Sequence, residues 1–527
     1  MIEISKESDN GESSMDTRDL RTERTETDSI GSMNLPADCL YGIQTARAIV
    51  NFPVSHRPVR RELIRAMVQV KMAAAQAHLD LAQLPSGKAS AIADACNVLL
   101  CSILIENGES SSPSEIPPEK ASVLPAEYGS LTYTDVFPTD ALQGGAGTSA
   151  HMNVNEVLAN LGLQIMGHEY GEYQYLHPLD DVNLSQSTND VYPTSLRIAS
   201  IYLVRGLSKA LSGLQEALQQ KEQAFAGIIK LGRTQLMDAL PITLGEEFGA
   251  YAQAIARDRW RIYKVEERLR QTNMGGTAVG TGTNATRKYA YLVTDKLQAI
   301  TDLGLARAEY PMDLTQNCDV FVEVSGLLKS CAVNLIKISS DLRLMNSGPR
   351  GGFGEIHLEN RQAGSTIMAG KVNPVIAEMA GQTAMQVIAN DTAITMAAMS
   401  GQFELNAFLP LVADKLLESL SILKNAVILF RKYAVDTVVP DVQKCAEHVM
   451  QSTVLSTALI PDIGYEKAAL ISKEALAGRR TLLDVAREQS GLPEERLLEL
   501  LDIQHGLTYS QDRDDKPQAE DKENLTT

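Results

Sequence analysis

The sequence predicts an all-α protein built around a bundle of long helices. Only 5% of the 527 residues are aromatic, with a single Trp, whereas Ala, Leu, Gln and Glu dominate long stretches of the chain. Those four residues favour helices, and large aromatic side chains favour strands. Hydrophobic residues make up 44% and charged residues 22%, which are the proportions of a folded globular chain long enough to bury a large core.

Three segments carry apolar residues at helical spacing: 203–225, 251–270 and 415–430. Steps of three, four or seven residues place such side chains on one face of a helix, which must then be buried against a neighbour. We therefore predict long amphipathic helices that pack together as a bundle. The predicted apolar faces consist of Leu203, Leu207, Leu211, Leu214, Leu218 and Phe225; of Ile255, Ile262 and Leu269; and of Leu416, Leu420, Leu423, Val427 and Phe430.

Turn-forming residues suggest where the domains begin and end. The strong helical periodicity starts after Asn189-Asp190 and Pro193 and ends near Pro440, and shorter helical pieces follow at 466–477, 481–489 and 493–501. Polar ends predict disordered tails, and a stretch rich in Ser, Pro and Glu predicts a surface insertion, either functional or merely tolerated. The predicted order is a tail (1–20), an N-terminal domain (21–186) with the insertion (107–128), a central helical-bundle domain (187–441), a small C-terminal domain (442–510) and a second tail (511–527).

Charge and cysteine content exclude several classes of protein. The formal net charge of −18 lacks the basic surface that nucleic acids need, and it is repelled by anionic lipids. Six scattered cysteines without a CxxC pair indicate reduced thiols. The chain shows neither a long apolar span nor an apolar or Arg-rich leader, so we expect no membrane segment and a cytoplasmic location.

Four polar segments rich in Gly, Ser, Thr, Asn or Gln interrupt the helical pattern, at 143–149, 185–190, 232–235 and 347–374. Any one alone is typical of a turn or a helix N-cap. Together they offer many small hydrogen-bond donors suited to carboxylate oxygens, which predicts a shared site. No histidine pair has the spacing of zinc ligands, and no glycine-rich motif lies in a nucleotide-binding context. We therefore expect neither a metal nor a cofactor.

Several long motifs resemble conserved blocks of the fumarase/aspartase superfamily. The signature G-S-S-x-M-P-x-K-x-N reads GSTIMAGKVN at 364–373, followed by Pro374. The blocks QGGAGTS…MNVNEVLAN at 143–160, the segment 172–194 and GRTQL at 232–236 are similar to other family blocks in the same order. The resemblance covers residues 22–508, and within the superfamily it is closest to the aspartate ammonia-lyases.

The resemblance implies an architecture, an activity and partners. It implies a three-domain, all-α homotetramer with a twenty-helix core, in which each active site takes residues from three subunits. The implied reaction is the reversible anti elimination of ammonia from L-aspartate to give fumarate through an aci-carboxylate intermediate. The implied partners are a small dicarboxylate substrate and other copies of the chain.

The resemblance also implies the roles of individual residues. Ser365 matches the catalytic base and would act as an alkoxide stabilised by Lys371 and by backbone N–H groups, because a neutral hydroxyl is a poor base. The ordinary alternative is a helix-capping serine on a rigid turn. Asn373 completes the implied catalytic group, and Glu378 is a candidate network residue. The implied substrate-binding residues are Thr148, Ser187, Thr188, Asn189, Thr234, Gln235, Thr366 and Met368.

Departures from the family pattern keep alternative functions open. Fumarases typically have His where this chain has Gln235, which favours the ammonia-lyase over a class II fumarate hydratase. Thr366 and Ala369 replace Ser and Pro of the signature, and His151 replaces a common Asn. These changes leave open a lyase for a substituted aspartate or succinate. A catalytically silent homologue is the alternative from a different class.

Overall fold

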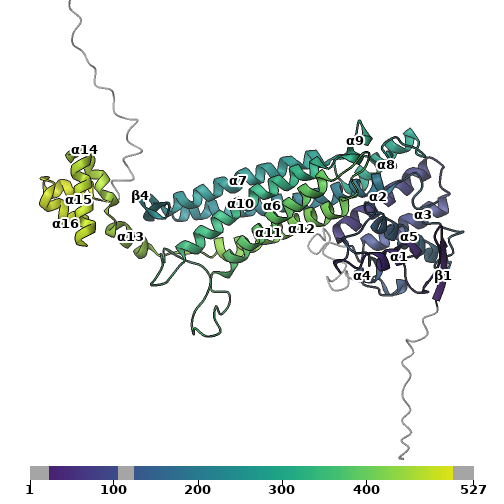
Figure 1. The fold of residues 1–527 in the computed structure, drawn as a ribbon, viewed down its shortest axis with the longest axis horizontal. Helices are drawn as coiled ribbons and strands as arrows, with labels where there is room; N and C mark the ends of the chain where they lie inside the picture. Colours follow the sequence, from purple (N-terminus) through teal and green to yellow (C-terminus); the bar gives the residue numbers. More distant parts are fainter. Residues whose placement is uncertain (1–22, 105–123, 503–527) are drawn as a thin grey trace, which may run out of the picture. The chain divides into compact units, whose positions relative to one another are not determined.

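The structure, a computed structural model, describes residues 23–104 and 124–502 (Figure 1). The predicted tails at 1–20 and 511–527, and most of the predicted insertion at 107–128, lie outside these residues. The chain is predominantly helical, as predicted. The helices are α1 (Ile43–Asn51), α2 (Arg61–Asp80), α3 (Ser86–Leu100), α4 (Tyr133–Val136), α5 (Thr148–Ile165), α6 (Thr188–Ala224), α7 (Leu244–Leu269), α8 (Arg287–Thr301), α9 (Pro311–Gln316), α10 (Asp319–Met345), α11 (Val375–Met399), α12 (Leu409–Phe430), α13 (Val442–Gln451), α14 (Ile460–Ile463), α15 (Tyr465–Gly478), α16 (Leu482–Gln489) and α17 (Glu494–Leu500).

The strands in the described residues are short and pair only in twos. The pairs β1–β2, β3–β4 and β7–β8 are antiparallel, and β5–β6 is parallel. Sheets of two strands contribute little core, so the helices determine the architecture. The strands are β1 (Glu23–Asp28), β2 (Gly31–Pro36), β3 (Ile229–Thr234), β4 (Met237–Thr243), β5 (Gln271–Thr272), β6 (Ala306–Arg307), β7 (Ile356–His357) and β8 (Val439–Pro440).

The chain divides into two compact units, each assembled from separate stretches. Unit 1 consists of the described residues of Met1–Leu203, Val265–Ser325 and Asn390–Glu418, and unit 2 of those of Val204–Lys264, Gly326–Ala389 and Ser419–Thr527. The division into an N-terminal, a central and a C-terminal domain stays a prediction.

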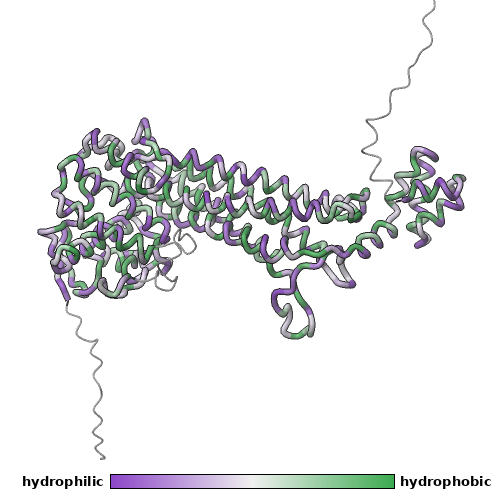
Figure 2. Tube along the Cα trace, turned by 180° about the vertical axis from the view of Figure 1, so that it is seen from behind, coloured by the Kyte–Doolittle hydropathy of each residue, from purple (hydrophilic) through white to green (hydrophobic). Residues whose placement is uncertain are grey.

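The apolar faces of the long helices are buried as predicted. Every residue of the three predicted faces, on α6, α7 and α12 or directly after α6, is at most 5% exposed. Hydrophobic and hydrophilic residues alternate along these helices, as Figure 2 shows. In unit 2, hydrogen bonds of the buried Tyr251 and Asp258 add specific contacts between α7 and α10: Tyr251 donates to Asp341 Oδ2 at 2.8 Å, and Asn334 donates to Asp258 Oδ2 at 2.8 Å.

Helix α6 begins at Thr188, before the proline that the sequence placed at its start. Pro193 lies inside the helix and has no N–H to donate to the carbonyl four residues earlier. That carbonyl belongs to Asn189, and it accepts a hydrogen bond from Asn273 Nδ2 at 3.0 Å instead. The helix therefore begins about one and a half turns before Pro193, because a side chain distant in sequence replaces the missing donor.

The C-terminal helices α15, α16 and α17 match the three predicted short helices within two residues at each end. Together with Leu459, they form a small core of Ala468, Ile471, Ala475, Leu482, Val485, Ala486 and Leu497. None of the helices in residues 23–104 and 124–502 has the length and apolar content needed to span a membrane.

A buried carboxylate joins α5 to the start of α1 in unit 1. Glu156 is 2% exposed and accepts hydrogen bonds from the backbone N–H groups of Gly42 (2.9 Å), Gln44 (2.8 Å) and Thr45 (3.1 Å). The Thr45 hydroxyl donates a fourth bond to it at 2.6 Å. All four partners are donors, so a carboxylate, which only accepts, fits this position.

We expect Glu156→Gln to destabilise the protein by about 2–3 kcal/mol, because its amide NH2 would face hydrogen-bond donors. A thermal melt monitored by circular dichroism would show a lower Tm. The exposed Glu216 on α6 provides the matched control, and Glu216→Gln should leave Tm nearly unchanged. Equal Tm values for the two variants would contradict the role assigned to Glu156.

Candidate active site

The four polar segments lie at the ends of helices or between secondary-structure elements. Segment 143–149 leads into α5, and segment 185–190 forms the start of α6. Segment 232–235 lies at the end of β3, and segment 347–374 connects α10 to α11. Such positions leave backbone N–H groups and short side chains available to a ligand.

Thr148 is the first residue of α5 and is exposed. Its hydroxyl donates to the Gly145 carbonyl at 2.7 Å. The preceding Gly147 has φ +94°, and a Cβ there would lie 2.2 Å from the Tyr192 ring. Only glycine satisfies both constraints, so this close packing sets the position from which Thr148 begins the helix.

Ser187, Thr188 and Asn189 are half-buried and each has a local partner in unit 1. The Ser187 hydroxyl accepts from the Asn189 backbone N–H at 3.2 Å, which caps the start of α6. Asn189 Nδ2 donates to the Ala278 carbonyl at 2.7 Å. Thr188 Oγ1 lies 2.8 Å from His151 Nδ1 on α5. This last bond joins α5, two residues after the first polar segment, to the second segment.

Two fully buried charged residues that the sequence analysis did not single out support segment 185–190. The Lys71 ammonium donates to Asn183 Oδ1 at 2.8 Å and to Gln186 Oε1 at 2.9 Å. Burial lowers the pKa of Lys71 well below its usual range, partly offset by the charge of Asp190. A lone lysine between the apolar residues Val70 and Met72, in a stretch of mostly apolar residues at 66–77, was the signal that could have identified it.

Asp190 fixes the same segment from the other side. Its carboxylate accepts from the backbone N–H groups of Ser187 (2.9 Å), Gly275 (3.2 Å) and Thr277 (3.1 Å). Burial raises the pKa of Asp190 to about 6, although these three donors favour the ionised form. The segment 185–190 is thus held in place by a buried cation, a buried carboxyl group and the ring of His151.

The signature segment 364–373 closes on itself in unit 2. The Gly364 N–H donates to the Lys371 carbonyl at 2.8 Å, and Asn373 Nδ2 donates to the Gly364 carbonyl at 3.0 Å. A Cβ at Gly364 would lie 2.8 Å from the Lys371 carbonyl oxygen, so the closure requires glycine at this position.

Within this loop, two backbone N–H groups converge on the Ser365 hydroxyl. Oγ accepts from Ile367 N at 3.2 Å and from Met368 N at 2.8 Å. Such donors stabilise negative charge on the oxygen, as a serine alkoxide requires. Lys371, Thr366 and Met368 on the same loop are exposed, and Ser365 and Asn373 are half-buried.

Thr234 and Gln235 are exposed at the tip of the β3–β4 hairpin. The hairpin turns through two residues, Gln235 and Leu236, with φ of +53° and +64°. Two positive φ values define a type I′ turn, which normally contains Asn or Gly. The left-handed backbone costs each of these residues about 1 kcal/mol or more, and such strain concentrates at functional sites.

Behind this hairpin lies a buried charge network that the sequence analysis did not assign. Glu355 is 0% exposed; Oε1 lies 2.7 Å from Arg233 Nη2 and 2.9 Å from His448 Nδ1. Its other oxygen lies 3.3 Å from Lys230 Nζ. Burial alone raises the pKa of Glu355, but Arg233 and Lys230 together hold it below its ordinary value. The network ties the hairpin to the segment before α11 and to α13.

The structure thus brings part of the predicted site together. In unit 1 the His151–Thr188 bond joins the segments that contain Thr148 and Ser187–Asn189. In unit 2 the loop 364–373 gathers Ser365, Lys371 and Asn373, but no hydrogen bond or ion pair among the described residues joins this loop to the hairpin tip. Glu378, in the first turn of α11, accepts from Gln382 Nε2 at 3.2 Å.

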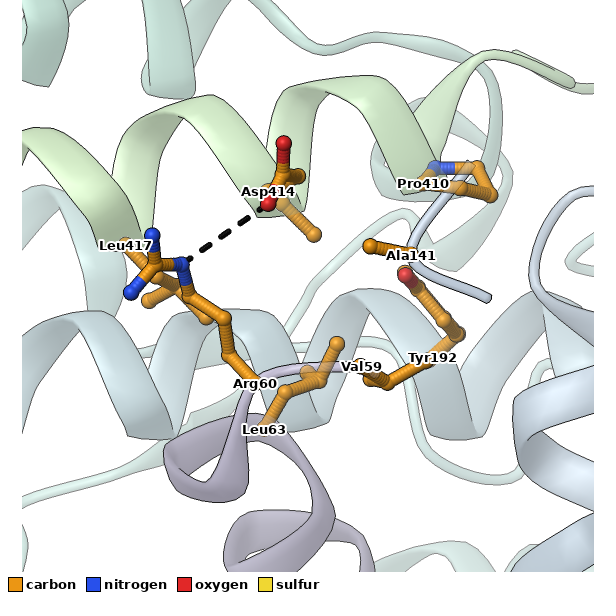
Figure 3. A pocket seen from close by; sticks show the side chains of 9 residues that line it. Val59, Arg60, Leu63, Ala141, Tyr192, Pro410, Asp414 and Leu417 are labelled. Atoms are coloured by element: carbon orange, nitrogen blue, oxygen red, sulfur yellow. Dashed lines mark ion pairs between the residues drawn. The ribbon is translucent and has the colours of Figure 1, made fainter. Parts of the chain in front are cut away.

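A small cavity in unit 1 lies beside the first two polar segments, because Ala141 and Tyr192, which flank segments 143–149 and 185–190, belong to its lining (Figure 3). Its volume is about 10 Å³, enough for about one water molecule and far too small for a four-carbon dicarboxylate. Arg60 points toward the buried Asp414, with 3.8 Å between Nε and Oδ1. The cavity is lined by Val59, Arg60, Leu63, Ala141, Tyr192, Pro410, Ala413, Asp414 and Leu417.

The described residues contain no group of three His, Cys, Asp or Glu side chains arranged to hold a metal ion.

Comparisons with known proteins match nearly the whole chain. Residues 114–389 match the family model described as "Lyase", and residues 455–505 match the one described as "Fumarase C C-terminus". An aspartate ammonia-lyase from Pseudomonas aeruginosa is 43% identical over 92% of this chain and 96% of its own length.

Two solved structures are similar in fold. A fumarate lyase:delta crystallin from Brucella melitensis, determined bound to cobalt, has a TM-score of 0.81 and 42% identity, covering 92% of this chain and 99% of its own. A class II fumarase from Schistosoma mansoni has a TM-score of 0.82 and 29% identity, covering 92% of this chain and 98% of its own.

Proposed function

The chain belongs to the fumarase/aspartase superfamily of lyases, and on this premise we propose that it is an aspartate ammonia-lyase, which interconverts L-aspartate with fumarate and ammonia. The observation that carries this choice is the identity of 43% to an aspartate ammonia-lyase, against 29% to a class II fumarase, at similar coverage. Gln235, at the position where fumarases typically have His, supports the same choice.

The chemistry begins with removal of a proton from the carbon next to a carboxylate. That C–H bond is weakly acidic, and its cleavage gives a dianionic aci-carboxylate that needs preorganised donors. Ser365, as an alkoxide, takes the proton, and the N–H groups of Ile367 and Met368 stabilise its charge before transfer. The electron pair then forms the C=C bond of fumarate as the amine leaves from the adjacent carbon.

The remaining site residues bind the two ends of the substrate. Lys371 and Asn373 bind one carboxylate, and Asn189 lies near the amino group. Thr366 and Met368 complete the signature loop around the substrate, and Glu378 is a supporting network residue. The donors for the other carboxylate are Thr148, Ser187, Thr188, Thr234 and Gln235.

We also propose that the chain forms a homotetramer in which several copies complete each site. Long helices leave large apolar side chains exposed, among them Met385 (59%), Met396 (61%) and Met399 (77%) on α11. Exposed apolar patches of this kind mark interaction surfaces. Gln235 and Lys371 are exposed in the single chain, which suits residues that face a substrate held between copies.

Absorbance at the fumarate band distinguishes the candidate functions. We expect purified protein to form fumarate from L-aspartate but not from L-malate. Turnover of L-malate alone would identify a fumarate hydratase. Turnover of only an N-substituted aspartate would identify a lyase with a modified substrate, and no turnover of any succinate derivative would identify a silent homologue. Each of these three outcomes contradicts the proposal.

A further inference from the structure

His151 lies at the junction of two polar segments and uses only one of its two ring nitrogens. The side chain is 1% exposed on α5, about one turn after Thr148. Nδ1 lies 2.8 Å from Thr188 Oγ1. Nε2 is buried and has no hydrogen-bond partner among the residues that the structure describes. A ring nitrogen buried in this way restricts where the proton can reside.

The surroundings exclude the charged form of the ring. Burial, together with the nearby positive charge of Lys71, holds the pKa of His151 well below its ordinary value. An imidazolium would also place an Nε2–H donor in a position without an acceptor. Leaving such a buried donor unsatisfied is unfavourable, because it loses its hydrogen bond to water without gaining another. His151 is therefore neutral and carries one proton.

The two neutral forms of the ring differ in whether Nε2 carries the proton or only a lone pair. With the proton on Nε2, the ring again buries an N–H group without a partner. With the proton on Nδ1, the N–H group is bonded to Thr188 and only a lone pair stays unpaired. Orphaned buried N–H groups are rarer than under-satisfied acceptors. The Nδ1–H form is thus the favoured one.

This assignment fixes the direction of the Thr188 hydroxyl. If Nδ1–H donates to Oγ1, the single hydroxyl hydrogen of Thr188 points to another acceptor. Thr188 is half-buried at the start of α6, beside Ser187 and Asn189. We propose that His151 is a positioning residue that makes the Thr188 hydroxyl a donor to a substrate carboxylate. The proposal rests on the proposed function for the identity of that substrate.

Three substitutions separate this role from simple packing. Asn at 151 carries a nitrogen at the same bond distance from Cα as Nδ1, so His151→Asn keeps a donor for Thr188. His151→Leu fills a similar volume without any donor. Thr188→Val keeps the shape of the side chain and removes the hydroxyl. Thermal melts verify that each variant is folded, and His151→Met, which also lacks a donor, replaces His151→Leu if the latter does not fold.

Succinate, a dicarboxylate without an amino group, is the probe. We expect His151→Leu to weaken succinate binding, measured by calorimetry, by roughly tenfold, the effect of losing one hydrogen bond to a charged group. The KM for L-aspartate should rise by a similar factor. His151→Asn should stay within about threefold of the parent on both measures. In the Thr188→Val background, His151→Leu should add less than about twofold.

Two results would overturn the proposal. Independent, multiplicative effects of His151→Leu and Thr188→Val would show that the two residues do not act together. Unchanged succinate binding with a raised KM for L-aspartate would show that the hydroxyl serves the amino group instead. Because calorimetry needs no turnover, an inactive parent protein would count against the proposed function and leave the His151 comparison measurable.

Discussion

Replacing Ser365 with alanine is expected to lower kcat for L-aspartate by ~10²–10⁴-fold, the usual contribution of a positioned general base. The change removes the oxygen on which the N–H groups of Ile367 and Met368 converge at 3.2 Å and 2.8 Å. It leaves the Gly364–Lys371 and Asn373–Gly364 bonds that close the loop. Succinate should therefore bind to Ser365→Ala within about threefold of its affinity for the parent, because the loss falls on the chemical step.

A control variant next to the same loop distinguishes the loss of the Ser365 hydroxyl from a general disturbance of the loop. Gln362 is exposed two residues before Gly364, and Gln362→Ala should retain parental kcat and KM. Steady-state formation of fumarate, with succinate calorimetry on both variants, makes the comparison. If Ser365→Ala keeps kcat within about threefold of the parent, the two N–H groups only cap a turn, and another residue removes the proton.

The helices could be predicted because their information is local. The apolar residues of α6, α7 and α12 recur at helical spacing, and each one is buried in the structure. The β3–β4 hairpin could not be predicted in the same way. Its turn contains Gln235 and Leu236 in a conformation that normally selects Asn or Gly, so its sequence lacks the usual signal.

The candidate site was predictable only where a motif is continuous in sequence. The signature loop holds Ser365, Lys371 and Asn373 within nine residues, and its closure follows from Gly364. Lys71 and Asp190 depend on partners elsewhere in the chain; Lys71, for instance, binds Gln186, 115 residues away. No local pattern shows which buried lysine meets which amide oxygen, so these supports become visible only in three dimensions.

The Glu355 network is another such support, and we expect Glu355→Gln to destabilise the protein by about 3–5 kcal/mol at pH 7. The amide would leave Arg233 without its counter-charge, and it would leave Lys230, which is 2% exposed, with only Glu247, whose Oε2 lies 2.9 Å from Nζ. A lower Tm tests this expectation. The matched control is Glu359→Gln, because Glu359 forms an exposed pair with Arg361 at 2.9 Å. Exposed pairs contribute at most about 1 kcal/mol.

The pH dependence of this difference provides a second test. The pKa of Glu355 is lowered in the folded protein, so its contribution is complete above the unfolded value of about 4.3 and is lost as the pH falls through the folded value. The difference in Tm between the parent and Glu355→Gln should therefore persist from pH 8 to pH 5 and shrink in stronger acid. A difference that disappears between pH 8 and pH 6 would implicate a different titrating group.

Activity distinguishes a support for the hairpin from a general stabiliser. Arg233 directly precedes Thr234, and Glu355 holds it at 2.7 Å. Below its Tm, Glu355→Gln should therefore raise the KM for L-aspartate, because the proposed carboxylate donors Thr234 and Gln235 would lose their fixed position. Glu156→Gln lowers stability in unit 1 without touching the hairpin, and it should leave KM unchanged. Equal KM values for the parent, Glu355→Gln and Glu156→Gln would show that Glu355 stabilises the fold without positioning the hairpin for substrate binding.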